Sequence, residues 1–271
     1  MRTLRSVSVL ALLAGFAAIP AQAATQLQII GLTADQRLVA FRENSPQLTR
    51  TIGSVFGLGG NDTQLVGIDF RPATGALYGL GNAGGVYTLD LKTAEATFKA
   101  QLDMALSGTS FGVDFNPTVD RLRIISDSGQ NLRANVDDGT TSLDLVLNNA
   151  GVTALGVTGA AYTNNDLDAN TATTLFDIDS SLDQVAIQAP PNNGSLNPSG
   201  KLLVDVGSPV GFDIYSRLSQ GRTVVAIGFA ALSTGGRAGF FRINLLAGEA
   251  TLRGWFPVND QVVDIALPLA Q

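Results

Sequence analysis

Four aspartates stand in short copies of one motif, and they are the residues of this sequence best suited to chemistry. They are Asp69 in GIDF, Asp114 in GVDF, Asp213 in GFDI and Asp264 in VDI. Carboxylates gathered in one place can hold a hard cation such as calcium, or act as the acid and base of a glycosidase. They can also accept backbone N–H groups and serve only the fold. A catalytic pair is usually asymmetric, so the repetition favours a structural role over a functional carboxylate ring.

A second polar group lies in the run SFGVDFNPTVDRLRIISDSGQNLR, residues 110–133. Its members beyond Asp114 include Asn116, Arg121, Arg123, Asn131 and Arg133. Arg121 and Arg123 are two apart on a predicted strand, so both side chains lie on one face of it. A buried arginine pair needs carboxylates, which Asp114 or Asp69 could supply. We interpret the group as an internal ion network between two sheets; a polar pocket for a sugar, carboxylate or phosphate is the alternative.

The run NNDLDAN, residues 164–170, offers oxygen ligands at alternating positions in Asp166, Asp168 and Asn170. This spacing resembles a calcium loop, with Asp177 at the twelfth position. However, the sixth position is Thr171 rather than glycine, and the last ligand is an aspartate rather than a glutamate. A solvated polar turn is therefore the default interpretation, and calcium is the one cofactor that the sequence leaves open.

Composition excludes several classes of function. The chain has no histidine and no cysteine, so Ser-His-Asp and Cys-His catalysis and ordinary zinc, copper or haem ligation are excluded. Lys and Arg number 17 against 23 acidic residues, for a net charge of -6. An acidic chain without a basic cluster lacks the electrostatic footprint of a nucleic-acid binder.

The first residues predict an export signal. Residues 1–23 carry two arginines near the start, an apolar stretch over 7–19, and Ala-Gln-Ala before the expected cleavage site. That stretch is shorter than the roughly 20 residues that span a bilayer, and no second one follows. We therefore expect a mature single domain of residues 24–271 without a membrane span, in the periplasm or the medium, acting as a monomer.

The motif copies reveal a repeat that predicts the architecture. Positions 69, 114, 161, 213 and 264 are 45, 47, 52 and 51 residues apart, close to the length of a four-stranded propeller blade. The copy at 159–162 keeps the glycine and an aromatic residue but has Ala161 where the aspartate is expected. Each interval holds short β-type runs separated by turn residues. In the fourth repeat we expect 200–207 as the outer strand and 189–200 as an inserted loop.

The two chain ends complete the repeat. Residues 27–32, 37–42 and 48–55 have the pattern of the last three strands of a blade, and 262–267 supplies the missing first strand. Pairing them would leave no open edge at the junction. We therefore predict an all-β fold: a five-bladed β-propeller of four-stranded antiparallel blades, closed by pairing of the C-terminal strand with the N-terminal blade. A row of tandem β-sandwiches is the alternative.

The sequence also resembles a known family. The run over 110–133, with LVGIDFRPATGALYGL, GAAYTNN, TTLFDID and PPNNGSLNPSG, is similar to the bacterial domain-of-unknown-function family 4394 across nearly the whole mature chain. The resemblance implies an exported β-propeller-like protein, and it implies no activity because the family has no assigned catalytic or binding residues.

We interpret the chain as a non-catalytic binding or scaffold protein whose partner is a small molecule, a glycan or another protein. A carbohydrate-active hydrolase with carboxylates at the channel mouth is one alternative. It is disfavoured because Glu43, Glu95 and Glu249 fall near predicted outer strands and Trp255 is the only tryptophan. A calcium-stabilised structural protein is the other alternative.

Overall fold

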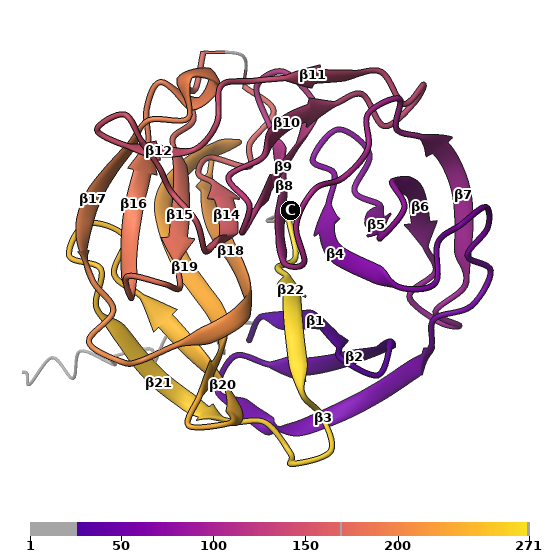
Figure 1. Cartoon of the computed structure of the whole chain (residues 1–271). Coiled ribbons are helices and arrows are strands. Elements are labelled where there is room, and N and C mark those ends of the chain that lie inside the picture. The colour runs from indigo at the N-terminus through magenta and orange to yellow at the C-terminus, as the bar shows by residue number, and fades with distance from the viewer. Residues whose placement is uncertain (1–25, 169, 270–271) are drawn as a thin grey trace, which may run out of the picture.

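Five four-stranded antiparallel sheets surround a central axis as the blades of a propeller (Figure 1). The structure, a computed structural model, describes residues 26–168 and 170–269. The predicted five-bladed all-β fold is confirmed. Within the described residues the one helical element is a single 3₁₀ turn, η1 (Pro191–Asn193), and no helix is long and apolar enough to cross a membrane. The predicted export signal lies outside the described residues.

Blade 1 closes the ring by joining the two ends of the chain. Its strands are β22 (Val262–Ala266), β1 (Gln28–Thr33), β2 (Arg37–Arg42) and β3 (Ser45–Ser54), in that order from the axis outward. Gly31 of β1 pairs with Ile265 of β22 in an antiparallel register. The predicted pairing between the C-terminal strand and the N-terminal blade is therefore confirmed.

The other four blades each use four consecutive strands, beginning at the axis. Blade 2 contains β4 (Leu65–Phe70), β5 (Leu77–Gly81), β6 (Gly85–Leu89) and β7 (Ala96–Gln101). Blade 3 contains β8 (Phe111–Asn116), β9 (Arg121–Ser126), β10 (Asn131–Ala134) and β11 (Thr141–Leu143). A small hairpin, β12 (Asn148–Asn149) and β13 (Val152–Thr153), follows blade 3.

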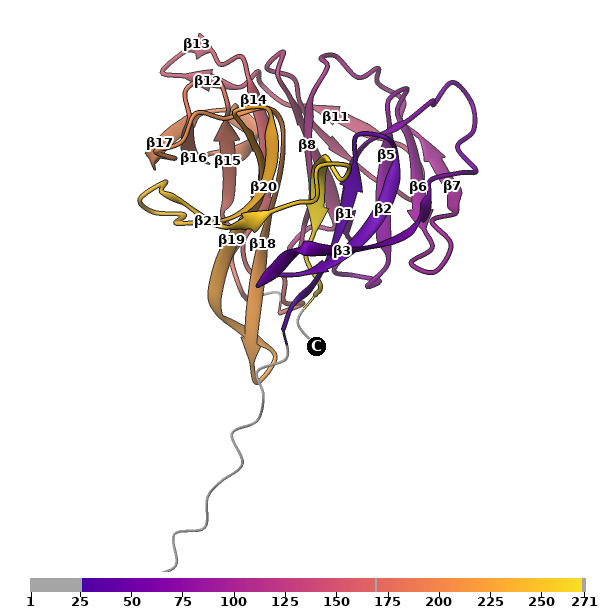
Figure 2. The same ribbon diagram turned by 90° about the horizontal axis from the view of Figure 1, so that it is seen from below.

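The last two blades complete the ring. Blade 4 contains β14 (Val157–Tyr162), β15 (Leu175–Asp179), β16 (Gln184–Gln188) and β17 (Leu196–Lys201). Blade 5 contains β18 (Gly207–Ser219), β19 (Arg222–Thr234), β20 (Arg237–Ile243) and β21 (Ala250–Trp255). Figure 2 shows the long β18–β19 hairpin extending from the disc on the side where both described chain ends lie.

The outer strand of blade 4 differs from the prediction. It is β17 over 196–201, so the segment expected to be an inserted loop supplies the strand, and 202–206 connects to blade 5. Pro198 of this strand pairs with Ala186 next to a register shift. A proline is tolerated there because the outermost strand has a neighbour on one side only.

We call the interface between two neighbouring blades a seam. The repeated glycines allow the blades to approach closely near the axis. A Cβ atom on Gly112 would lie 2.7 Å from the backbone nitrogen of Ala160, and one on Gly67 would lie 2.3 Å from a methyl group of Val113. Buried apolar side chains fill the rest of each seam, as in seam 4–5, where Phe176, Phe212 and Phe241 belong to one cluster.

Candidate functional site

The four repeated aspartates join the blades to one another. Each side chain lies on an innermost strand and accepts a hydrogen bond from a backbone N–H of the next blade. The pairs are Asp264 with Ile68 at 2.7 Å, Asp69 with Phe115 at 2.7 Å, Asp114 with Tyr162 at 2.8 Å and Asp213 with Leu267 at 2.6 Å. We call each of these contacts a carboxylate latch. The donors belong to the neighbouring blade rather than to an adjacent turn, so the latches hold the ring together.

The latch carboxylates also converge on one another. Asp69, Asp114 and Asp213 each place one oxygen within 4.8 Å of the others, and all are buried. Burial raises the pKa of Asp213 to about 6. Burial first, and neighbouring carboxylates second, raise the pKa of Asp69 and Asp114 well above the ordinary value. Burial raises the pKa of Asp264 in the same way. A cation held by this ring stays a prediction.

One seam has no carboxylate latch. Blade 4 carries Ala161 at the marker position, so no carboxylate on β14 reaches blade 5. Ala161 instead packs in the apolar cluster with Phe176 and Phe212. Seam 4–5 is therefore joined near the axis by apolar packing and by Asn165, whose backbone N–H donates to Ser216 Oγ at 2.9 Å and whose side-chain amide donates to the carbonyl of Ile214 at 3.4 Å.

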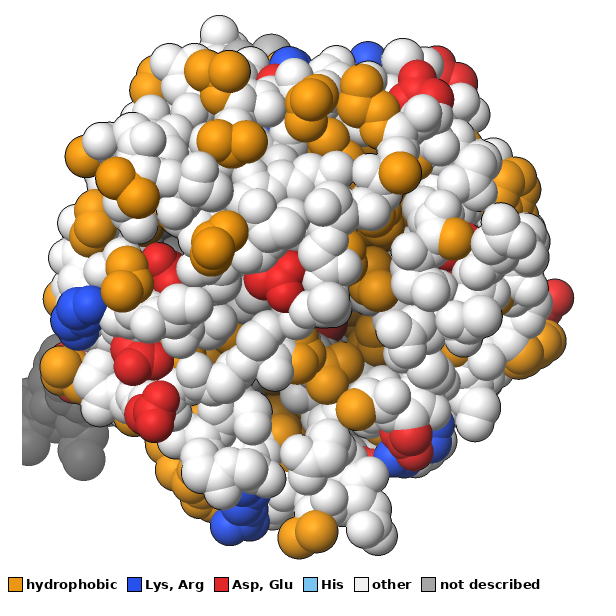
Figure 3. Space-filling view, viewed as in Figure 1, with side chains coloured by type: hydrophobic (Ala, Val, Ile, Leu, Met, Phe, Trp, Pro, Cys, Tyr) orange, Lys and Arg blue, Asp and Glu red, His pale blue; other side chains and the backbone are white. Residues whose placement is uncertain are grey.

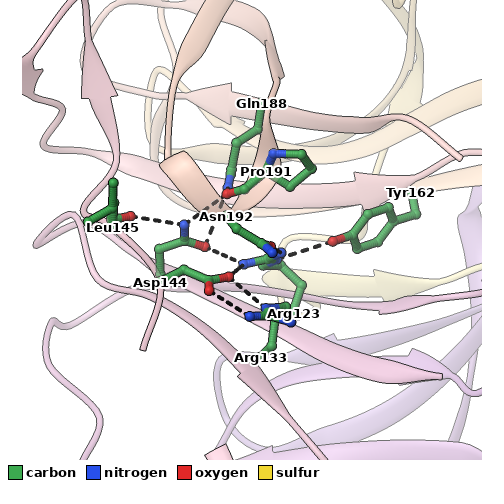
Figure 4. A network of polar contacts seen from close by, with 9 residues as sticks. Arg123, Arg133, Asp144, Leu145, Tyr162, Gln188, Pro191 and Asn192 are labelled. Atoms are coloured by element: carbon green, nitrogen blue, oxygen red, sulfur yellow. Dashed lines mark hydrogen bonds and ion pairs between the residues drawn. The ribbon is translucent and has the colours of Figure 1, made fainter. Parts of the chain in front are cut away.

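Seam 3–4 contains a buried polar network around Arg123 of β9 (Figure 4). This side chain is 1% exposed, and all three of its nitrogens donate. Nε donates to the hydroxyl of Tyr162 at 3.1 Å, Nη1 to Asn131 Oδ1 and Asp144 Oδ2 at 2.7 Å each, and Nη2 to Asn192 Oδ1 at 3.1 Å. The guanidinium thus links blade 3 to the inner strand of blade 4 and to the turn before β17.

Further residues extend this network. Arg133 donates to both oxygens of Asp144 at 2.8 Å, so one carboxylate is shared by two guanidinium groups. The amide of Asn131 donates to the carbonyls of Leu145 and Pro191 at 3.1 Å each, and Gln188 also donates to the carbonyl of Pro191. Nearly every donor is satisfied, which makes the network a rigid connection between blades.

The structure corrects part of the predicted network. Arg123, Asn131 and Arg133 do meet, but their carboxylate is Asp144 rather than Asp114 or Asp69. Arg121 is half-buried, and its side chain donates only to the carbonyl of Asp120 within the described part of the chain. Asn116 accepts the N–H groups of Thr118 and Val119 and closes its own turn. The predicted residues thus divide into latches, a seam network and local turns.

Asp177 of β15 is an unusual member of seam 3–4. Its side chain is fully buried, and neither carboxylate oxygen has a hydrogen-bond partner among the described residues. Burial raises its pKa well above the ordinary value, although the positive charge of Arg123 opposes this shift. Gln188 Oε1, on the neighbouring strand, also lacks a donor in the described structure. Alternation along β15 could have shown that Asp177 faces a seam, but nothing in the sequence indicated that it would be unpaired.

Sequence reasoning also missed the ion clamp of seam 2–3. Arg71 directly follows β4, is 5% exposed, and makes paired hydrogen bonds of 2.6 to 2.8 Å to both Asp120 and Asp137 of blade 3. It also donates to the hydroxyl of Tyr78 at 3.2 Å. The available signal was a charged residue directly after a buried strand in the GIDFRP copy of the repeat.

The predicted calcium loop lies between β14 and β15 and docks against the β18–β19 hairpin. Asp166 accepts the N–H of Thr223 at 2.8 Å, and Asp168 pairs with Arg222 at 2.7 Å. Asp168 also accepts the N–H of Asn170. These contacts engage both carboxylates within the protein, and a calcium ion at this loop stays the alternative to a polar turn.

A groove of about 640 Å³ lies at seam 4–5. It is lined by Thr163, Thr174, Phe176, Ala226, Ile227, Arg242, Ile243, Asn244, Leu245, Leu246, Glu249 and Thr251. Its size falls within the usual range of roughly 300–1,000 Å³ for small-molecule sites. Figure 3 shows the face of the disc seen in Figure 1, where apolar side chains are scattered and acidic ones lie both near the centre and toward the rim. The groove is thus found at the seam that lacks a latch.

These features define a class of protein: a closed five-bladed propeller whose repeated carboxylates are used between blades. The chain matches the family described as "Domain of unknown function (DUF4394)" over residues 37–266, and it belongs to that family. No curated protein matches the chain.

Several solved structures match this chain at low sequence identity. One, described as "The de novo evolutionary emergence of a symmetrical protein is shaped by folding constraints", is 14% identical with a TM-score of 0.50, covering 90% of this chain and 100% of that one. An auxiliary nutrient binding protein from Bacteroides thetaiotaomicron is 15% identical with a TM-score of 0.38, covering 80% of this chain and 52% of that one. Glutaminyl cyclase from Myxococcus xanthus is 11% identical with a TM-score of 0.42, covering 81% and 97%. At 14% identity the likeness to the first of these structures concerns the fold alone.

Proposed function

We propose that this chain is an exported, non-catalytic binding protein whose ligand occupies the groove at seam 4–5. The observation that carries the proposal is the groove itself, which combines about 640 Å³ of space with apolar, hydroxyl and charged lining groups. Ligand sites typically combine an apolar lining with a few polar groups that orient the ligand.

The latches support the non-catalytic part of the proposal. Each repeated aspartate accepts a backbone N–H of the next blade, so these carboxylates have a structural use in the ring. The export signal predicted for residues 1–23 supports the extracytoplasmic location.

The test is thermal unfolding of the mature protein in the presence of a fixed panel of probes: glucose, maltose, apolar amino acids, and aromatic and aliphatic carboxylates. A ligand that binds only the folded state raises the melting temperature. Thr174 is exposed and lines the groove, so Thr174→Trp should fill it and abolish the shift. Thr97→Trp, at an exposed position on β7, is the matched control and should retain the shift. A panel without any shift, or a shift that persists in Thr174→Trp, would overturn the proposal.

A further inference from the structure

Two opposite charges lie on one rim of the groove without pairing. Arg242 of β20 is directly opposite Thr251 of β21. The carbonyl of Glu249 accepts the N–H of Asn244, so the antiparallel pairing of the two strands continues as far as Glu249. Glu249 and Thr251 are two residues apart, which places Glu249 and Arg242 on the same face as diagonal neighbours. Both are exposed, and neither forms an ion pair or a side-chain hydrogen bond within the described ranges.

The spacing of these charges limits what can bridge them. Diagonal neighbours across antiparallel strands are roughly 7–8 Å apart at their backbones. A ligand with a carboxylate and an ammonium on one carbon fits such a gap, because each of its charges reaches the opposite charge on the rim. A purely anionic ligand would be attracted by Arg242 but repelled by Glu249, in a chain whose net charge is -6.

The remaining lining indicates the rest of the ligand. Ile227 and Leu245 are half-buried and Leu246 is exposed, and all three line the groove, whereas Phe176 is only 5% exposed. Such a surface favours an apolar side chain. It disfavours a sugar, because the nearly covered ring of Phe176 offers little face for stacking, and Trp255 is absent from the lining.

We infer that the groove selects zwitterionic amino acids with a large apolar side chain, Arg242 binding the carboxylate and Glu249 the ammonium group. This inference rests on the proposed function, because it names the ligand class of the same groove. Arg242 and Glu249 are then specificity-determining residues, and the apolar lining supplies the contact with the side chain.

Isothermal titration calorimetry tests the inference with three probes: L-phenylalanine, its amide, which lacks the carboxylate, and N-acetyl-L-phenylalanine, which lacks the ammonium group. Wild-type protein should bind L-phenylalanine about tenfold more tightly than either derivative, a typical effect of losing one charge-assisted hydrogen bond. Arg242→Gln should remove the preference over the amide and keep the preference over the acetyl derivative. Glu249→Gln should remove the preference over the acetyl derivative and keep the preference over the amide. Arg253 is exposed on β21 outside the lining, so Arg253→Gln should leave both preferences unchanged.

The outcomes separate this inference from the proposed function. If another probe of the panel binds and Thr174→Trp blocks it, while L-phenylalanine shows no binding, the amino-acid assignment is wrong and the groove remains a binding site. Equal affinity for all three compounds, or unchanged preferences in Arg242→Gln and Glu249→Gln, would also overturn the assignment. Loss of binding for every probe would overturn both.

Discussion

The two seams on either side of blade 4 are joined in different ways. Seam 3–4 has a carboxylate latch from Asp114 and a network around Arg123, and both of these side chains are buried between the blades. Seam 4–5 has Ala161 at the latch position, an apolar cluster, and the groove. The repeated motif thus marks where the ring is fastened, and the one copy that departs from it marks the seam with room for a ligand.

A copy of the repeat that departs from the others marks a place where their shared structural requirement does not apply. A carboxylate that recurs in four of five copies serves a requirement that the blades share. The copy without it is relieved of that requirement, because apolar packing and the hydrogen bonds from Asn165 to β18 hold the seam. A binding site placed there does not compete with the polar contacts that close the ring.

The largest expected effect is the loss of the guanidinium in seam 3–4. Arg123→Met should lower the free energy of unfolding by about 3–5 kcal/mol, because Asp144 loses one of its two partners and several buried acceptors lose their donor. Urea denaturation of the variant and wild type measures this difference. The matched control is Arg121→Met, because Arg121 lies on the same face of the same strand and donates only to a carbonyl. This variant should change the free energy of unfolding by less than about 0.5 kcal/mol. Equal losses in the two variants would contradict the assignment of Arg123 as the connection between blades.

The next effect concerns the latches, which all lie outside seam 4–5. The raised pKa of Asp213, about 6, means that the folded state keeps a proton that the unfolded state releases above the ordinary value of 3.8. The contribution of this group to stability is therefore fully present below about pH 3.8 and is lost as the pH rises to about 6, amounting to about 3 kcal/mol at 1.36 kcal/mol per pKa unit.

Thermal unfolding between pH 4.5 and 8 checks this pH dependence. Asp213→Asn should flatten the curve, since the amide does not titrate and its oxygen still accepts one backbone N–H. Several exposed aspartates, such as Asp90 and Asp138, have a lowered pKa through hydrogen bonds from backbone N–H groups, and they affect stability only at lower pH. A melting temperature that rises steadily from pH 5 to 8 would show that the latch carboxylates are not protonated in the folded protein.

The last prediction concerns Asp177 in seam 3–4. Burial raises the pKa of Asp177, while Arg123 opposes the shift, so the folded state binds a proton more readily than the unfolded state. Asp177→Asn should match wild type near pH 4 and be more stable at pH 8, by about 1.4 kcal/mol for each unit by which folding raises this pKa. Chemical denaturation at the two pH values gives the comparison. If the variant is instead less stable at pH 8, then Asp177 is ionised and paired with Arg123.

The sequence predicted some features of the candidate site but not others. The recurrence of Asp69, Asp114, Asp213 and Asp264 indicated a shared structural use, and the structure places these side chains between blades. Alternation along β9 predicted the face that Arg123 occupies. It could not predict that Asp144 is the partner, because Asp144 belongs to a short segment after β11 whose position depends on how blades 3 and 4 meet. The outer strand of blade 4 lies at 196–201 rather than 200–207. The Pro, Asn, Gly and Ser residues of 189–200 are typical of a loop, but the sheet edge tolerates Pro198 within a strand.

Spacing and alternation along the chain are enough to predict the repeat, the order of strands within each blade, and the closure of the ring. Only the tertiary structure decided which backbone N–H each carboxylate accepts, which aspartate pairs with Arg123, and where the groove lies. The physical reason is that alternation fixes which face of a strand a side chain occupies. The residue that it meets there is set by the packing of separate blades, which brings together positions as distant as Arg123 and Asn192.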